Sequence, residues 1–160
     1  DGTYNNESIY SRNHNFSVPA QTTHVEIVAT ITGHGFGKDN ANCAEFCDHQ
    51  HHYYMGPHHT YEWHPIVYSN TGCENEISNG VVANQFGSWP YGRAGWCAGQ
   101  DVKQWTYDIT SWVDMNGQNN ELTYRGLFNG QEYNPTGESG KGGRNIVAEI
   151  WVVFYTNSTA

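Results

Sequence analysis

Residues 24–32 read HVEIVATIT, and this stretch decides the fold class because its side chains alternate in character. One face carries Val25, Ile27, Ala29 and Ile31, and the other carries Glu26, Thr30 and Thr32. A period of two predicts a β-strand. Residues 145–156, NIVAEIWVVFYT, show the same alternation with an apolar second face, which predicts a central strand covered on both sides.

Further short apolar stretches are separated by segments rich in Gly, Asn, Asp and Pro. They occupy residues 9–18, 50–55, 60–68, 80–86, 104–109 and 121–128. Residues 101–113 fit a period of two better than a helix. For a chain of 160 residues this pattern predicts an all-β fold, a two-sheet antiparallel jelly roll of about eight strands. We expect a strand-like amino-terminal segment at residues 1–18 and a single jelly-roll domain at residues 19–160.

The charge of the chain excludes two classes of partner. Sixteen acidic against seven basic residues give a net charge of −9, which repels nucleic acid and anionic lipid. The longest apolar run, residues 150–155, is far shorter than the ~20 residues that span a bilayer, so we expect no membrane insertion. The chain starts at Asp1 without an apolar leader, which we interpret as a processed, soluble protein.

Four cysteines and three glycosylation sequons indicate an oxidising compartment. The cysteines are Cys43, Cys47, Cys73 and Cys97, and the sequons begin at Asn6, Asn15 and Asn157. Of the three possible pairings we favour Cys43 with Cys47 and Cys73 with Cys97. The alternative is a zinc site in which Cys43 and Cys47 join His49 and His51. Together these features predict a secreted glycoprotein, extracellular or at the cell surface.

Seven of the nine histidines lie between residues 33 and 64, which suggests a metal site. In an extended chain His49 and His51 project from the same face, and His64 follows on the next predicted strand. These three residues are candidate ligands for copper or zinc, and Met55 is a further copper candidate. The alternative is that the histidines are exposed and stack on neighbouring tyrosines.

The loop of residues 33–47 holds a second candidate site. Its glycines at 33, 35 and 37 precede no helix that would bind phosphate, so we exclude nucleotide binding. Glu45 lies between two cysteines and is a candidate general acid or base. No second carboxylate stands at a recognisable catalytic spacing from it.

Two segments carry a resemblance to a known family. Residues 32–47, TGHGFGKDNANCAEFC, and residues 91–99, YGRAGWCAG, resemble the C-terminal domain of the peptide-N-glycosidase F family, and the resemblance extends from about residue 16 to the end. It implies one of two adjacent jelly rolls, an architecture shared with copper-dependent peptide-amidating monooxygenases, and the cysteine pairs favoured above. It also implies that Glu45 is an active-site carboxylate, and that Trp96 and Arg93 bind ligand near a sugar-binding cleft.

This sequence departs from the family in three ways. The family's principal catalytic Asp belongs to the other jelly roll, the His-rich stretch is unusual, and Ala98 stands where Pro is usual. We therefore favour a non-enzymatic structural or interaction protein that binds copies of itself. Residues 1–18, through Ile9, Tyr10, Phe16 and Val18, would add a strand to a neighbour and build a filament. The alternatives are an amidase half-domain that acts on N-glycans with a second jelly-roll domain, and a His-based copper or zinc protein.

Overall fold

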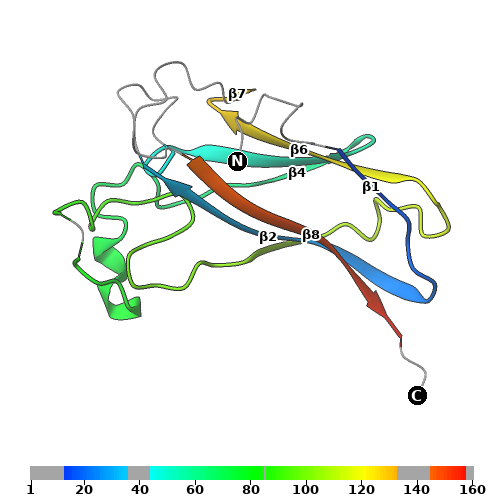
Figure 1. Cartoon of the computed structure of the whole chain (residues 1–160), viewed down its shortest axis with the longest axis horizontal. Helices are drawn as coiled ribbons and strands as arrows, with labels where there is room; N and C mark the ends of the chain where they lie inside the picture. The colour runs from blue at the N-terminus through cyan, green and yellow to red at the C-terminus, as the bar shows by residue number, and fades with distance from the viewer. Residues whose placement is uncertain (1–12, 36–43, 85, 133–144, 158–160) are drawn as a thin grey trace.

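The computed structural model describes residues 13–35, 44–84, 86–132 and 145–157, which form two antiparallel sheets packed face to face (Figure 1). One sheet has the order β1-β6-β3-β4, with β7 paired to β6; the other has the order β5-β2-β8. The strands of the first sheet are β1 (Asn13–Phe16), β3 (His49–Met55), β4 (His58–Glu62), β6 (Asn120–Phe128) and β7 (Gln131–Glu132). Those of the second are β2 (Thr22–His34), β5 (Trp105–Asp108) and β8 (Asn145–Thr156). The predicted all-β jelly roll is confirmed.

The core lies between the sheets and is built on the apolar face of β2. Val25, Ile27, Ala29 and Ile31 are at most 1% exposed. They pack against inward residues of the other sheet, which include Tyr53, Met55, Leu122 and Tyr124. The alternation seen in the sequence therefore places every second residue of β2 in the core.

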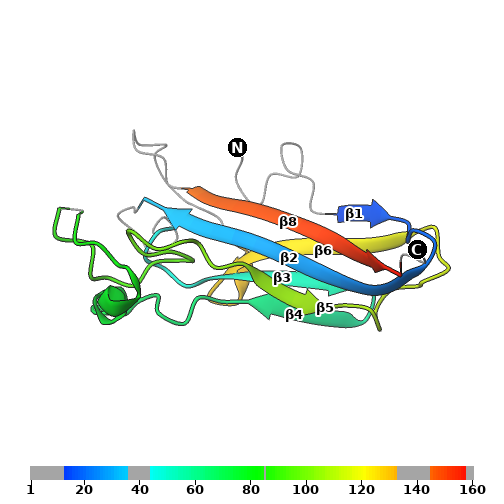
Figure 2. The ribbon, with the colours of Figure 1, turned by 90° about the horizontal axis from the view of Figure 1, so that it is seen from below.

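β8 is an edge strand, and the predicted central position is wrong. Among the described strands it pairs with β2 alone, and it forms the rim of its sheet (Figure 2). On its outer face Val147, Trp151 and Tyr155 are 51%, 60% and 45% exposed. The apolar character of that face, which suggested a covering layer, belongs to open surface in this chain.

Other predicted strands are shorter than expected or absent. Strand β4 ends at Glu62, so the predicted strand at residues 60–68 continues as turns. In the predicted strand at 80–86, residues 80–84 and 86 have no strand pairing, and they follow the 3₁₀ helix η2 (Glu74–Asn79). Gly80 closes that helix with a φ of 103°, a conformation that costs glycine little.

The amino-terminal segment is partly incorporated in the fold. Asn13–Phe16 pairs with β6, while Phe16 and Val18 pack on the core. Residues 1–12 lie outside the described part.

Long loops gather at one end of the sandwich and are joined by a disulfide between Cys73 and Cys97. Cys47 is disulfide-bonded as well, and its predicted partner Cys43 lies outside the described residues. Because its sulfur is in a disulfide, Cys47 is not a zinc ligand, and the alternative cysteine–histidine zinc site is wrong. Within the described ranges no helix has the length and apolar character needed to cross a membrane.

Candidate functional site

Three loop segments meet where β2 ends, and main-chain hydrogen bonds join them. Gly33 donates to the carbonyl of Ala94, Ala94 to that of Glu45, and Glu45 to that of Gly35, at 2.8–2.9 Å. Gly33 has no room for a side chain, because a Cβ would collide with the Ala44 carbonyl. Gly35 has a φ of 74°, in the left-handed region. Gly33 and Gly35 therefore allow the loop segments to approach one another closely. This packing role, rather than phosphate binding, accounts for the two glycines.

Glu45 and Arg93 form an ion pair within these loops. Arg93 Nε donates to Glu45 Oε1 at 2.7 Å, and the main-chain N–H of Gly35 donates to Glu45 Oε2 at 3.1 Å. The Arg93 side chain is 0% exposed and that of Glu45 is 13% exposed. Both carboxylate oxygens are therefore engaged inside the protein.

The remaining nitrogens of Arg93 are also satisfied. Nη1 donates to the carbonyls of Trp89 and Tyr91, and Nη2 donates to Ser88 Oγ at 3.4 Å. The guanidinium lies between the Phe46 and Trp96 rings, 5.2 and 4.9 Å from their centroids. Such a guanidinium holds the loops together through hydrogen bonds made within the protein, and Arg93 is also part of the lining of a neighbouring pocket.

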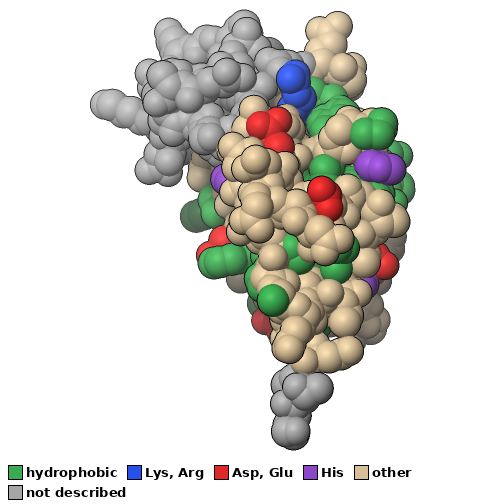
Figure 3. All heavy atoms as spheres, turned by 90° about the vertical axis from the view of Figure 1, so that its right-hand side faces the viewer, with side chains coloured by type: hydrophobic (Ala, Val, Ile, Leu, Met, Phe, Trp, Pro, Cys, Tyr) green, Lys and Arg blue, Asp and Glu red, His purple; other side chains and the backbone are tan. Residues whose placement is uncertain are grey.

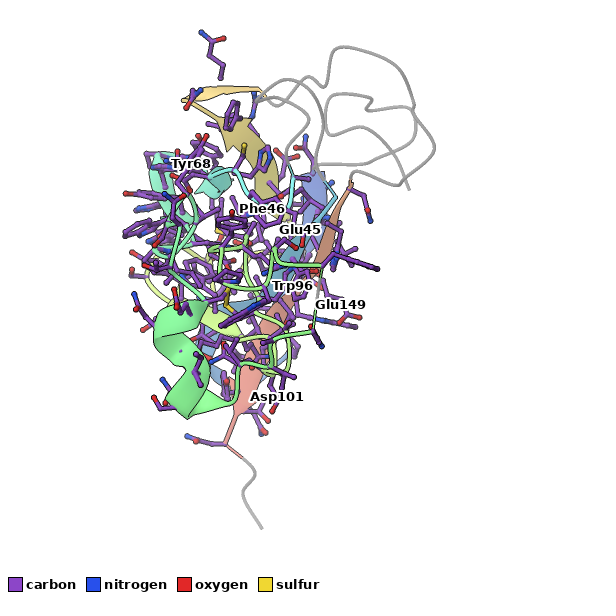
Figure 4. All side chains as sticks on the ribbon, turned by 90° about the vertical axis from the view of Figure 1, so that its left-hand side faces the viewer. Glu45, Phe46, Tyr68, Trp96, Asp101 and Glu149 are labelled. Carbon is purple, nitrogen blue, oxygen red and sulfur yellow. A yellow bond between two sulfur atoms is a disulfide. The ribbon has the colours of Figure 1, made fainter. Side chains whose placement is uncertain are left out.

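Trp96 completes this cluster. Its Nε1 donates to the Gly33 carbonyl at 2.7 Å, and its ring stacks on His34 at 5.4 Å. Figure 4 shows Glu45, Phe46 and Trp96 grouped at this end of the molecule, with Asp101 farther away. The structure thus brings Glu45, Arg93 and Trp96 together. They form one structural unit in which each side chain contacts another member or the adjoining loops.

A pocket of about 250 Å³ opens beside this unit. Its lining includes the indoles of Trp63, Trp96 and Trp105 together with Glu62 and His64. Trp63, Trp105 and Glu62 were not among the site residues predicted from the sequence. The three tryptophans, at 63, 96 and 105, were the only hint of this pocket in the sequence. Because they are far apart along the chain, nothing indicated that they would lie together.

The three predicted metal ligands His49, His51 and His64 are all buried, with exposures of 2%, 0% and 5%. The His51 and His64 ring centroids are 5.5 Å apart, and His49 packs against Phe128 at 5.2 Å. The opposite expectation, of exposed histidines stacked on tyrosines, describes His59, whose ring stacks on Tyr54 at 4.6 Å. The His-rich stretch therefore splits between the two faces of its sheet. Met55 lies in the apolar core.

Glu62 joins the buried histidines and was missed from the sequence. Its Oε1 lies 3.4 Å from His64 Nε2, and its side chain is 8% exposed. This distance would suit an ion pair, but burial favours the neutral form of each group. Burial raises the pKa of Glu62 to about 8 and lowers the pKa of His64 to about 4. The only sequence signal was the spacing of two between Glu62 and His64.

The other imidazoles in this region are also held neutral. Burial, with the nearby His64, lowers the pKa of His49 to about 4, and the same two causes lower that of His51. His51 Nδ1 is 2.7 Å from the Tyr124 hydroxyl, which fixes the orientation of its ring. Neutral imidazoles are the form that binds metals.

Two of the three predicted glycosylation asparagines, Asn15 and Asn157, are described residues. Asn15 is an exposed residue of β1, opposite Glu121, and Asn157 is exposed just after β8. Asn6 lies outside the described part. Whether glycans are attached at these asparagines stays a prediction.

The sequence profile described as peptide-N-glycosidase F, C terminal, matches residues 3–153. The chain belongs to this family. A search of curated proteins found no match. A crystal structure of a peptide-N(4)-(N-acetyl-β-D-glucosaminyl) asparagine amidase is similar, with a TM-score of 0.66 and 20% identity over 98% of this chain. A structure of peptide-N-glycosidase F from Flavobacterium meningosepticum, described as a glycosylasparaginase, gives a TM-score of 0.65 and also 20% identity over 98% of this chain.

This chain covers only 51% and 50% of those two solved structures. It therefore spans about half the length of the solved relatives. At 20% identity, the likeness to those structures shows a shared fold.

Proposed function

We propose that this domain is an extracellular structural subunit that assembles with copies of itself, and that by itself it does not hydrolyse glycans. The observation that carries this proposal is the open edge of β8. Strand β8 is 12 residues long and pairs only with β2 among the described strands. Its other edge offers main-chain hydrogen-bonding groups to an incoming strand.

In the described part of the chain, the inward side chains of β8 are also incompletely covered. Across their pairing, Ile31 opposes Ala148 and Ala29 opposes Ile150. The β2 residues are fully buried, whereas Ile150 is half-buried and Ala148 is exposed. One sheet has three strands and the other has five. A further strand beside β8 would cover these side chains and extend the smaller sheet.

The edge of β8 lacks the charges that normally discourage strand addition. Glu149 is its only charged residue, and it contains no lysine or proline. On the face of the molecule seen in Figure 3, Lys and Arg side chains are sparse. An apolar, weakly charged edge of this length favours pairing with another chain.

The occupant that we assign to this edge is the segment of residues 1–12 of a neighbouring copy. Twelve extended residues span roughly 40 Å, the length of a strand such as β8. The segment contains Ile9 and Tyr10. Phe16 and Val18 pack on their own core, so they are excluded from the donated strand. Strand exchange from one copy to the next would build a filament.

Deleting residues 1–12, which leaves β1 in place, tests this assignment. We expect the full chain to form polymers by electron microscopy and sedimentation, and the truncated chain to remain monomeric. Ala148→Lys places a charge in the open seam and should also prevent assembly. The adjacent Val147→Lys, on the outer face, is the matched control and should assemble. Equal assembly by all four proteins, or a full chain that is monomeric at every salt concentration, would refute the proposal.

The extracellular setting is supported by the Cys73–Cys97 disulfide and by the exposure of Asn15 and Asn157. Disulfides persist in oxidising compartments, and exposed sequons are accessible to glycosylation. Mass spectrometry of the native protein should find glycans at these asparagines. Unmodified asparagines in the native protein would remove this support.

The family suggests amidase activity as the second candidate. The carboxylate of Glu45 is held by Arg93 and a main-chain N–H, and amide hydrolysis requires several groups acting together. We therefore expect the purified chain to release no N-glycan from a denatured glycopeptide. Release by the chain that Glu45→Gln abolishes would establish the amidase instead.

A further inference from the structure

A cluster of buried polar side chains between the sheets lacks hydrogen-bond partners. His51, Glu62 and His64 are 0%, 6% and 5% exposed. Among the described residues, His51 Nε2, both His64 ring nitrogens and Glu62 Oε2 have no hydrogen-bond partner. Buried polar groups are nearly always paired, and an unpaired cluster indicates a missing water or ion. Three of these four atoms belong to imidazoles, which are common metal ligands.

Two spacings within this cluster match those of ligands that share one metal ion. Tetrahedral zinc holds its nitrogen and oxygen ligands at about 2.0–2.2 Å, so two such atoms lie roughly 3.3–3.5 Å apart. Glu62 Oε1 and His64 Nε2 are 3.4 Å apart. Two imidazoles on the same zinc have ring centres roughly 5–6 Å apart, and those of His51 and His64 are 5.5 Å apart.

The surroundings orient His51 for such a role. Its Nδ1 is hydrogen-bonded to the Tyr124 hydroxyl at 2.7 Å, which leaves Nε2 as the metal-binding nitrogen. Metal-bound histidines usually make a hydrogen bond of this kind with the other ring nitrogen. Tyr124 is itself buried, with 2% exposure. The hydrogen bond therefore lies within the rigid part of the sandwich.

A pocket also adjoins the cluster. Glu62 and His64 line the pocket of about 250 Å³ described above. Gly95, also in its lining, has no room for a side chain, because a Cβ would lie 3.0 Å from His64 Cε1 and would overlap the Ile31 carbonyl. The pocket therefore lies directly beside two of the three side chains of the cluster.

We propose that His51, Glu62 and His64 bind one divalent zinc ion. Two imidazoles and one carboxylate form a common ligand set for zinc sites that keep a fourth position open. Among the described residues no group of three or more such side chains is already arranged to hold a metal. Binding therefore includes a movement of the Glu62 and His64 side chains toward the Nε2 atom of His51. The site differs from the sequence-based ligand set in using Glu62 in place of His49.

A second histidine pair, formed by the buried His52 and the exposed His59, provides the control. His52 Nδ1 and His59 Nε2 are 2.8 Å apart on the opposite face of the sheet. His59 is exposed, so an adventitious surface site would depend on this residue. His59→Gln removes this pair without touching the buried cluster.

The test is titration of the chelator-treated full chain with Zn²⁺ by calorimetry, and with Co²⁺ by visible absorption. We expect one Zn²⁺ per chain, a tetrahedral Co²⁺ spectrum, and the same affinity in His59→Gln. In His64→Gln the affinity should fall at least about tenfold, the loss that even outer-shell substitutions cause. The isosteric Glu62→Gln should show a similar loss, and it replaces His64→Gln if that variant does not fold.

Three results would overturn the proposal. They are the absence of Zn²⁺ binding to the chelator-treated chain, affinity that disappears in His59→Gln but persists in Glu62→Gln, and an octahedral Co²⁺ spectrum. None of them depends on self-assembly, because the ligands lie away from the edge of β8.

Discussion

Two buried polar clusters near the loop end of the sandwich differ in how their atoms are satisfied. In the Glu45–Arg93 cluster, all three guanidinium nitrogens and both carboxylate oxygens make hydrogen bonds. In the cluster of His51, Glu62 and His64, four side-chain atoms have no hydrogen-bond partner among the described residues. The first cluster is complete and acts as a structural brace. The second becomes complete only when something is added to it.

Breaking the complete cluster should have the largest effect. Arg93→Met leaves the Glu45 carboxylate without its partner, and removing one member of a buried ion pair costs about 3–5 kcal/mol of unfolding free energy. Urea denaturation followed by circular dichroism measures this loss. Arg93→Lys, which keeps the charge but not the planar fork, should lose less. A loss below about 1 kcal/mol in Arg93→Met would contradict the role of the cluster as a brace.

Opening the disulfide should have a somewhat smaller effect on the unfolding free energy, with its largest local effect around the same cluster. Cys73 and Cys97 are 24 residues apart, and closing such a loop contributes about 3.5 kcal/mol by chain entropy. Because Arg93 lies inside this loop, the double Cys→Ala variant should show faster hydrogen exchange at residues 88–96. Exchange in β3, which carries His51, should become faster only as far as the global unfolding free energy falls, and therefore less than at residues 88–96. Uniformly faster exchange in both regions would show that the two clusters are not mechanically separate.

Removing the incomplete cluster should change the unfolding free energy in the opposite direction. In metal-free protein, the double substitution Glu62→Met with His64→Leu replaces unsatisfied buried groups by apolar ones of similar volume. Such replacements are neutral or stabilise by about 1–2 kcal/mol. Urea denaturation in the presence of a chelator tests this sign. A loss of more than about 1 kcal/mol would mean that the two side chains have partners that complete them without metal.

The smallest effect belongs to a partly exposed pair, His24 and Glu26, which gives a reference for both buried clusters. His24 Nε2 lies 2.9 Å from Glu26, and Tyr155 donates to the same carboxylate at 2.7 Å. The hydrogen bond to Glu26, with Asp108 nearby, raises the pKa of His24. The hydrogen bonds from His24 and Tyr155 lower the pKa of Glu26.

The sign of the resulting pH dependence follows from these two directions. The His24 contribution is complete below its unfolded pKa of 6.5 and is lost as pH rises through the higher folded value. The Glu26 contribution is complete above 4.5 and is lost as pH falls through the lower folded value. Stability from this pair is therefore greatest between those values. His24→Gln should flatten the stability profile from pH 6 to 8, as measured by thermal unfolding; an unchanged slope would contradict the assignment.

The strands whose two faces differ could be predicted from the sequence. The alternation of residues 24–32 correctly placed the core face of β2, because one side of that strand is buried and the other is more polar. The same reasoning failed for β8, because an apolar face looks the same in a sequence whether a layer covers it or solvent does. It also failed at residues 80–86. There Val81 and Val82 have β-branched side chains but make only single main-chain hydrogen bonds, to Glu76 and Ala98.

The candidate sites show the same division. A spacing of two correctly grouped His49 and His51 on one buried face, since that relation is local. The approach of Glu62 to His64 and of both to His51 depends on the pairing of β3 with β4 and on the turn that follows β4. The hydrogen bond from Arg93 to Glu45 joins residues that are 48 positions apart in the sequence. A single sequence contains no physical signal for such distances, and the family resemblance supplied the grouping of Glu45, Arg93 and Trp96.

The outward position of Trp151 gives the molecule an optical signal of its own. Its indole is 60% exposed on β8, and Trp63 is the other exposed indole among the described residues, at 53%. In a Trp63→Phe variant, the red-edge tryptophan emission and its quenching by acrylamide would therefore arise mainly from β8. A blue shift of that emission would record the covering of this strand in real time, without any added label.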